Sequence, residues 1–334
     1  MTTTETPMMT LVEATRLALD DALAADPSVL LLGEDIADDE GGGVLHVTKG
    51  LSARHGTGRV RSTPISEQAI MGAAVGAAIA GMRPVAEIML MNFVAVCMDQ
   101  LFNHAAKLRF MSGGQTAVPL TVRTVTGAGA GFGAQHSDML EAWLAHAPGL
   151  KVVIPSSPAD AYGLLSSCIS DDDPCVFVEH TLLYYGGAAG PAPERGSRIP
   201  LGQANVVRTG GDVTLIAYGK PVIEAVGVAD TLGREGIGVE VIDLRTVSPW
   251  DETTVLESVA RTRRAVIAHE AVRRFGVGAE IAARIHEELH DTLAAPVGRV
   301  GSAFCPVPFA MPMEYRYLYS AEAIEAAVRA TLRA

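Results

Sequence analysis

The sequence predicts an α/β protein of two domains, each built on a largely parallel sheet. First, 334 residues are enough for two ordinary domains with separate cores. Second, short runs of β-branched residues alternate with helical stretches through most of the chain. Third, several of these runs are apolar throughout, as expected of strands that helices cover on both faces.

In the first half, five short runs, several of them apolar throughout, predict buried strands at residues 29–32, 85–89, 118–125, 151–154 and 175–179. Helices are expected at residues 67–80 and 95–110. A stretch rich in Gly, Ala and Pro then breaks the alternation. We therefore expect a first domain at residues 1–185, a linker at 186–200 and a second domain at 201–334.

The second half repeats the alternation. Strands are expected at residues 213–218, 239–244, 265–269 and 297–300. The helices between them are expected at residues 221–235, 249–261 and 278–289. This order of strands and helices predicts a second parallel sheet.

Composition and charge limit the kinds of partner. The net charge of −12 argues against nucleic acid or an anionic membrane surface as the main partner. No apolar run reaches the roughly 20 residues that span a bilayer. Because the start of the chain lacks the pattern of a signal peptide, we expect a cytoplasmic protein. The four cysteines are far apart and are expected to be buried, reduced thiols.

Two acidic positions are candidates for site residues. Gly33-Glu34-Asp35 directly follows the strand at 29–32, at the carboxyl end where open α/β sheets bind ligands. By position alone, a solvated loop or helix cap is the more common explanation, because acids in loops are usually exposed. Glu67 begins a helix of small residues that a second helix could approach closely. It is either a buried acid serving a basic group or an acid favoured by the helix dipole.

A glycine-rich stretch, residues 126–137, follows the strand at 118–125 and ends in His136-Ser137. Glycine permits close approach of the backbone to a ligand, and histidine suits proton transfer near neutral pH. A flexible loop with an incidental histidine is the alternative. As a dinucleotide fingerprint the stretch is weak, because no helix clearly starts within it.

Several other motifs are absent from the sequence. It has no Walker loop, no Gly-x-Ser-x-Gly elbow and no compact histidine motif for zinc. A Gly-Asp-Gly followed about thirty residues later by Asn, which in thiamine enzymes holds Mg²⁺ and diphosphate, is also missing.

Taken together, the motifs resemble the β subunits of 2-oxo acid dehydrogenases that depend on thiamine diphosphate, above all those of pyruvate and acetoin dehydrogenases. The resemblance runs from about residue 10 to the end. The motifs that carry it, in the order of that family, are Gly33-Glu34-Asp35, Thr63-Pro64-Ile65-Ser66-Glu67, Ala134-Gln135-His136-Ser137, Pro148-Gly149-Leu150-Lys151-Val152-Val153, Val241-Ile242-Asp243-Leu244-Arg245-Thr246, Phe275-Gly276-Val277-Gly278-Ala279-Glu280 and Pro306-Val307-Pro308-Phe309.

The resemblance implies a transketolase-like pyrimidine-binding domain followed by a transketolase C-terminal domain. It implies thiamine diphosphate shared with an α subunit, which holds the diphosphate and Mg²⁺, in an α₂β₂ heterotetramer. It further implies acyl transfer to lipoamide on a lipoyl domain or dihydrolipoyl acyltransferase core. The missing diphosphate motif agrees with this division between subunits.

Site residues follow from the same resemblance. Glu67 matches the glutamate that hydrogen-bonds the pyrimidine ring nitrogen, where a carboxyl with raised pKa would share a proton. Phe93 matches the aromatic residue that stacks on this ring, and Glu34 and Ile65 match residues lining the pocket. His136 matches the histidine that assists acyl transfer. A potassium ion would be bound by backbone groups at Leu120, Cys168, Ile169, Asp171 and Asp173.

Three alternatives remain. Gln135 stands where branched-chain relatives usually carry tyrosine, which disfavours a branched-chain 2-oxo acid dehydrogenase β subunit. Transketolase-like two-carbon transfer from a ketose would need phosphate-binding basic residues that the sequence does not place. A β-like subunit kept only for assembly is disfavoured because Glu67, Phe93 and His136 are all present.

Overall fold

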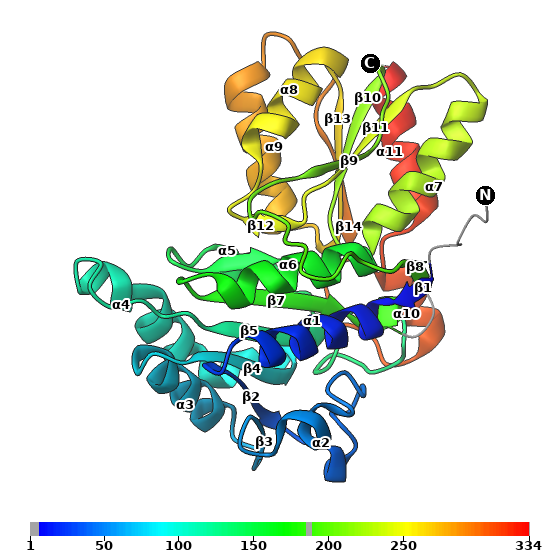
Figure 1. Cartoon of the computed structure of the whole chain (residues 1–334). Coiled ribbons are helices and arrows are strands. Elements are labelled where there is room, and N and C mark those ends of the chain that lie inside the picture. The colour runs from blue at the N-terminus through cyan, green and yellow to red at the C-terminus, as the bar shows by residue number, and fades with distance from the viewer. Residues whose placement is uncertain (1–6, 185–188, 334) are drawn as a thin grey trace, which may run out of the picture. The chain divides into compact units, whose positions relative to one another are not determined.

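The computed structural model describes residues 7–184 and 189–333. The chain divides into two compact units, Met1–Thr126 with Leu144–Leu201 and Gly127–Trp143 with Gly202–Ala334 (Figure 1). Each unit has its own sheet with covering helices, which confirms the predicted α/β class with largely parallel sheets. The domain boundary expected at residues 185–186 lies outside the described residues.

The first unit contributes six strands in the order β6-β7-β5-β4-β2-β3, and every neighbouring pair is parallel. All five strands expected in this half are present, and β3 was not predicted. The bounds are β2 (Val29–Glu34), β3 (Val60–Thr63), β4 (Arg83–Leu90), β5 (Thr121–Thr126), β6 (Lys151–Val153) and β7 (Cys175–His180).

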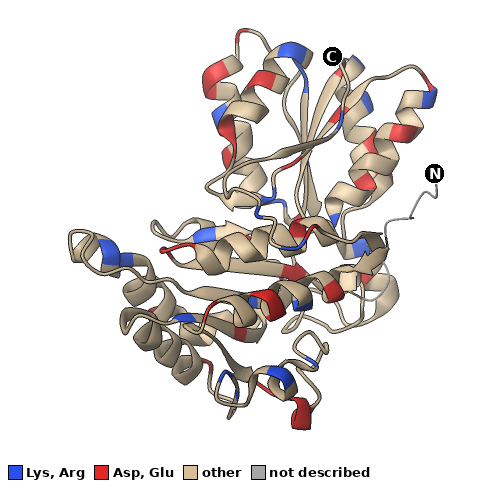
Figure 2. Cartoon of the chain, in the orientation of Figure 1, with Lys and Arg blue, Asp and Glu red and all other residues tan. Residues whose placement is uncertain are grey.

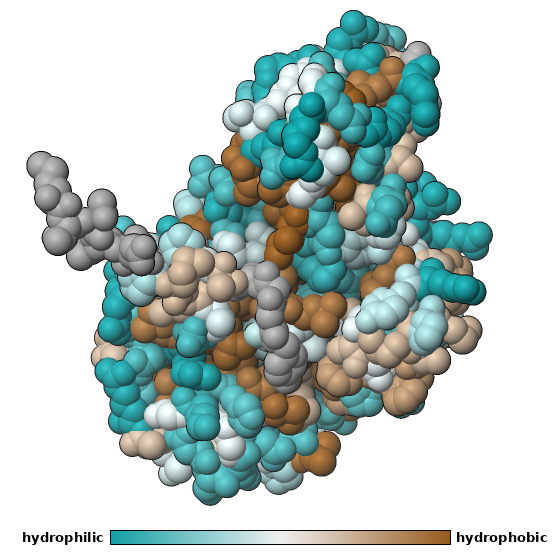
Figure 3. All heavy atoms as spheres, turned by 90° about the vertical axis from the view of Figure 1, so that its right-hand side faces the viewer, coloured by the Kyte–Doolittle hydropathy of each residue, from teal (hydrophilic) through white to brown (hydrophobic). Residues whose placement is uncertain are grey.

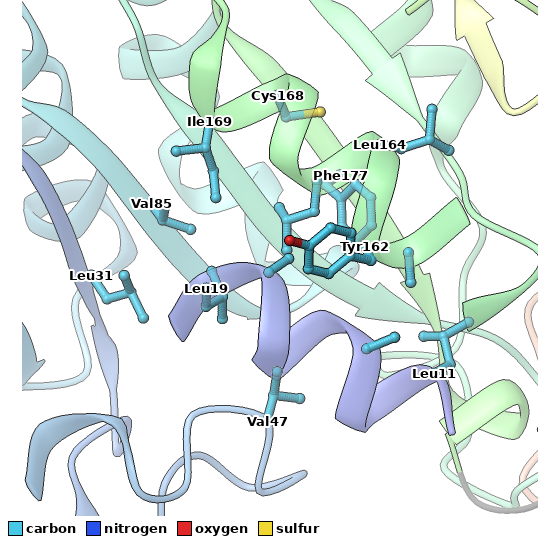
Figure 4. Close-up of a cluster of buried hydrophobic side chains, with 14 of the residues drawn as sticks. Leu11, Leu19, Leu31, Val47, Val85, Tyr162, Leu164, Cys168, Ile169 and Phe177 are labelled. Carbon is cyan, nitrogen blue, oxygen red and sulfur yellow. The ribbon is translucent and has the colours of Figure 1, made fainter. Parts of the chain in front are cut away.

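Two helices, α1 (Leu11–Ala25) and α6 (Pro158–Ser170), pack together on one face of this sheet. Thr10 and Glu13 form a capping box at the start of α1, and Ser157 caps α6 ahead of Pro158. Their inward side chains join those of β2, β4 and β7 in one buried cluster, with Leu19, Tyr162 and Phe177 near its centre (Figure 4). This cluster is the core of the first unit.

The helical stretch expected over residues 95–110 is present, but it is not one regular α-helix. The segment is a 3-10 helix, η2 (Met91–Cys97), then a π-helix, η3 (Asp99–Ala105), and only then an α-helix, α4 (Ala106–Met111). Tertiary packing decides this outcome, because η2 and η3 both lie against α3 (Glu67–Ile79). Such irregular turns are often found at functional sites.

The second unit holds a five-stranded sheet in the order β14-β13-β10-β11-β9, in which β9 alone among its described strands runs antiparallel to its neighbour. Figure 1 shows α8 and α9 on one side of this sheet and α7 and α11 on the other. The bounds are β9 (Asn205–Arg208), β10 (Val213–Ala217), β11 (Val239–Asp243), β13 (Ala265–Val272), β14 (Gly298–Ser302), α7 (Pro221–Arg234), α8 (Glu252–Thr262), α9 (Val277–Leu289) and α11 (Ala321–Arg333).

Shorter elements complete the chain. Within the stretch expected to be a linker, β8 (Ala189–Pro191) pairs antiparallel with β1 (Met8–Thr10). The remaining elements are η1 (Asp38–Glu40), α2 (Leu51–His55), α5 (Glu141–Ala145), β12 (Thr246–Ser248) and α10 (Met311–Tyr317).

The surface carries both signs of charge. In the view of Figure 2, Lys and Arg are scattered among Asp and Glu and form no continuous basic face. Among the described residues, no helix combines the length and apolar character needed to cross a membrane. All four cysteines are free; three are buried as predicted, whereas Cys305 is exposed.

Candidate active site

Two carboxylates meet at the carboxyl edge of the first sheet. Glu34 is the last residue of β2, and Glu67 is the first residue of α3. Burial raises the pKa of Glu34 above its ordinary value, and the negative charges of Asp35 and Glu67 raise it further. Glu67 therefore lies close enough for its charge to act on Glu34.

The backbone around Glu34 depends on a glycine. A Cβ added at Gly33 would stand 2.9 Å from Cβ of Glu87 on the neighbouring strand β4, a distance that real Cβ atoms do not adopt. Asp35 follows with a φ of 57°, in the left-handed region that acidic residues tolerate better than most. The close approach of β2 to β4 at Gly33 and the left-handed backbone at Asp35 together fix the position of the Glu34 backbone.

Apolar and aromatic residues lie next to this acid pair. Ile65 is 75% exposed and stands two residues before Glu67. Phe93 is half-buried in η2, which packs against α3. Burial and the charge of Glu67 raise the pKa of Cys97, also in η2, to about 12. Glu67 thus faces the segment that carries Phe93.

This arrangement suits a flat basic heterocycle. A carboxyl can hydrogen-bond a ring nitrogen, and a neighbouring aromatic ring can stack on the face of the ring. The predicted residues Glu34, Ile65, Glu67 and Phe93 come from β2, the loop before α3, α3 and η2. These residues fit the aminopyrimidine of thiamine diphosphate.

The glycine-rich loop, residues 127–137, belongs to the second unit. Three of its amide groups donate hydrogen bonds to buried carboxylates: Ala128 to Glu270 Oε1 at 2.8 Å, Gly129 to Glu314 Oε1 at 2.8 Å and Gly131 to Glu314 Oε2 at 2.9 Å. These three loop amides are thus used within the chain and do not face a phosphate. Sequence analysis did not find Glu270 or Glu314.

His136 lies near the end of this loop and is half-buried. Its backbone amide donates to the carbonyl of Gly133 at 3.2 Å. Five residues further on, Glu141 is fully buried and accepts a 2.7 Å hydrogen bond from the Tyr218 hydroxyl. Burial raises the pKa of Glu141 to about 7. No sequence motif indicated this buried carboxyl.

Four of the residues expected around potassium lie in the last turn of α6 or between α6 and β7, and Leu120 lies directly before β5. The backbone carbonyls of Ile169 and Asp171 accept hydrogen bonds from Nη1 of Arg83 at 3.2 and 2.9 Å. The carbonyls of Leu120 and Cys168 accept backbone bonds from Cys175 and Asp171 at 2.9 and 3.2 Å. The Asp173 carboxylate contacts Arg109 Nη1 at 2.7 Å. Among the described residues, no group of three or more His, Cys, Asp or Glu could hold a metal ion.

A cluster of charged side chains on three strands of the first sheet was also not predicted from the sequence. Arg123 on β5 lies between Glu87 on β4 and Glu179 on β7, with nitrogen–oxygen distances of 2.6 and 2.7 Å. The Arg123 and Glu179 side chains are almost completely buried, and burial raises the pKa of Glu179. Because each partner stands on a different strand, the cluster links the three central strands side by side.

Comparison with known proteins identifies both halves of the chain. Residues 7–186 match the transketolase pyrimidine binding domain, and residues 202–324 match the transketolase C-terminal domain. A structure described as a split gene transketolase, inactive beta4 tetramer, superposes with a TM-score of 0.76 and covers 97% of this chain and 98% of that one. Its sequence identity is 22%, so it supports the fold alone.

Two relatives are similar over nearly the whole chain. The β subunit of acetoin:2,6-dichlorophenolindophenol oxidoreductase from Cupriavidus necator is 47% identical over 324 residues, which cover 95% of each protein. The mitochondrial pyruvate dehydrogenase E1 component subunit beta-2 from Oryza sativa subsp. japonica is 44% identical over 331 residues, covering 98% of this chain and 87% of that protein.

Proposed function

The chain belongs to the family of acetoin and pyruvate dehydrogenase β subunits, and we propose that it cleaves a C–C bond of acetoin or pyruvate together with an α subunit. The observation that carries this proposal is the acid pair Glu34–Glu67 beside η2, in a chain similar to these relatives over nearly its full length. When bound, thiamine diphosphate supplies the nucleophilic carbon and takes up the electron pair released on cleavage.

The first unit provides the environment of the aminopyrimidine ring. Glu67 holds a proton at the ring nitrogen, and Glu34 favours that shared proton because two close carboxylates cannot both ionise easily. Phe93 stacks on the ring, and the exposed Ile65 gives the pocket an apolar wall. These side chains orient the ring and restrict water around the proton.

His136 has a separate role in the proposal. It transfers a proton during passage of the acyl group to a lipoyl group on an acyltransferase core or lipoyl domain. Its half-buried side chain remains within reach of solvent, as contact with a carrier protein requires. The loop that carries it is held by buried carboxylates, so the histidine is presented on a fixed backbone.

The α subunit is proposed to hold the diphosphate and Mg²⁺ and to complete an α₂β₂ heterotetramer. Support comes from one face of α3, which is exposed and made of small residues, including Gly72, Ala73 and Gly76. A Cβ at Gly76 would meet nothing within 4 Å. Small side chains let a partner helix approach closely, so this face suits a tight subunit contact.

Two finer points remain predictions from the resemblance. Potassium at the backbone near Leu120, Cys168, Ile169, Asp171 and Asp173 would share carbonyl groups with the Arg83 guanidinium. The cytoplasmic location rests on the sequence, and the relatives include both bacterial and mitochondrial proteins.

The test is turnover by the assembled pair. The chain is produced with its α subunit, supplied with thiamine diphosphate and Mg²⁺, and assayed on acetoin and on pyruvate with 2,6-dichlorophenolindophenol as electron acceptor. We expect activity in the pair and not in the chain alone. Glu67→Gln should lower kcat by about 100-fold or more, because it removes the carboxyl that shares the proton.

The matched control is Glu257→Gln, which changes an exposed glutamate on α8. It should leave both rates unchanged. Full activity of Glu67→Gln would overturn the proposed role of Glu67. Turnover of neither substrate by a pair that binds the cofactor would overturn the choice of substrate and direct attention to other donors.

A further inference from the structure

One side chain from a distant part of the chain accepts two hydrogen bonds from the glycine-rich loop. Glu314, in the short helix α10, is fully buried. Its two carboxylate oxygens accept hydrogen bonds from the amides of Gly129 and Gly131 at 2.8 and 2.9 Å. More than 180 residues separate the carboxylate from these amides in the sequence.

The geometry of this contact explains the glycines. Gly127, Gly129, Gly131 and Gly133 have φ angles of 118°, 103°, 75° and 74°. Left-handed residues alternating with others turn successive amides towards one concave side, which forms an anion-binding site. The anion here is the protein's own carboxylate. Because both oxygens are used, Glu314 fixes the loop at two points and sets its curvature.

Further contacts extend this anchorage towards His136. A Cβ at Gly131 would lie 3.1 Å from Sδ of Met311, and one at Gly133 would lie 2.9 Å from the Phe309 ring. The Gly133 carbonyl in turn accepts a hydrogen bond from the backbone amide of His136 at 3.2 Å. Residues 309–314 therefore hold the loop along its length, up to the backbone next to His136.

We propose that Glu314 is a positioning residue for His136. The proposal rests on the function proposed above, in which His136 assists acyl transfer. By holding Gly129 and Gly131, Glu314 fixes the path of the loop, and the loop fixes where the imidazole stands. A displacement of about 1 Å at a reacting group can lower a rate by roughly 100-fold, so a distant anchor of this kind is functionally important.

Glu314→Gln tests the proposal in the assembled αβ protein loaded with thiamine diphosphate. Glutamine keeps the size of the side chain but replaces one acceptor oxygen with a donor, so one loop amide loses its partner. We expect acyl transfer to a lipoyl domain to fall by about tenfold or more. Reduction of 2,6-dichlorophenolindophenol, which requires no acyl transfer, should fall much less. Equal losses in both assays would mean a general structural role and would overturn the proposal.

A double-mutant comparison separates this proposal from the proposed function. If Glu314 acts through His136, adding Glu314→Gln to His136→Ala should lower acyl transfer no further. Multiplied losses in the double variant would overturn the positioning role. Unchanged acyl transfer in His136→Ala alone would instead overturn the role of His136 itself. Glu257→Gln serves again as the exposed control.

A second variant covers the case in which Glu314→Gln does not fold. Phe309 is 75% exposed, so Phe309→Ala removes little buried surface, yet it takes away the ring that lies against Gly133. We expect the same preferential loss of acyl transfer, smaller in size. If Phe309→Ala and any folded Glu314 variant both leave acyl transfer unchanged, the 309–314 segment does not position His136.

Discussion

Among single residues, Glu141 should make stability depend on pH. Burial raises its pKa from 4.5 to about 7, so the folded state binds a proton that the unfolded state releases. Stability from this group is fully present below about pH 4.5 and is lost as pH rises through 7. The free energy of unfolding should therefore be roughly 3 kcal/mol lower at pH 8 than at pH 4.5 on account of Glu141. Thermal unfolding of the αβ protein between pH 5.5 and 8 measures this change.

Variants of Glu141 and Tyr218 test whether Glu141 causes this pH dependence of stability. Glu141→Gln removes the titrating group, so its unfolding temperature should change less between pH 5.5 and 8 than that of the wild type. Tyr218→Phe removes the hydrogen bond that lowers the pKa of Glu141, and should shift the loss of stability to higher pH. A pH profile that is the same in wild type and Glu141→Gln would show that Glu141 stays ionised when folded.

Among the secondary-structure elements, α3 offers a test of the subunit contact. Gly76→Leu places a large side chain on the exposed face of α3, where no neighbour lies within 4 Å in this chain. The fold should tolerate it, since replacing a mid-helix glycine gains about 0.5–1 kcal/mol. Association with the α subunit should weaken by about 1–3 kcal/mol, because a close-packed contact is overfilled. Titration calorimetry of the two subunits measures the Kd.

The matched control for α3 is Gly227→Leu in α7. Gly227 is also helical and exposed, and a Cβ there would meet nothing within 4 Å. It should bring the same gain in helix stability with no change in Kd. If Gly76→Leu and Gly227→Leu bind the α subunit equally well, the exposed face of α3 is not the contact.

The secondary-structure elements also show which parts of the structure can be predicted from sequence. The parallel strand β2 begins with four apolar residues, Val29 to Leu32, so local pattern alone locates it. The helical stretch expected over residues 95–110 is present, but no local pattern specifies the 3-10 and π turns of η2 and η3, which pack against α3. Glu34 and Glu67 became candidates through motifs near strand ends. Glu314 could not be recognised as a candidate, because the amides that it binds are remote in sequence. An acid within an apolar tail forms no local sequence motif.

In the molecule as a whole, a well-formed interior coexists with large apolar side chains on the surface. Both units have continuous buried clusters. Yet Phe110 is 90% exposed, Met111 is 74% exposed and Val96 is 50% exposed. Figure 3 shows hydrophobic residues reaching the surface among hydrophilic ones on one face. Exposed apolar side chains of this size favour association, which a net charge of −12 opposes only over long range.

We therefore expect the chain alone to self-associate at micromolar concentration, and more strongly at high salt, which screens its charge. Addition of the α subunit should replace this association with one defined heteromer and raise the unfolding temperature, because a partner that binds only the folded state stabilises it. Sedimentation velocity over a dilution series, with and without the α subunit, measures both effects. The double variant Phe110→Ser, Met111→Ser should reduce self-association. If the wild-type chain stays monomeric at all concentrations and salt levels, these side chains need no partner.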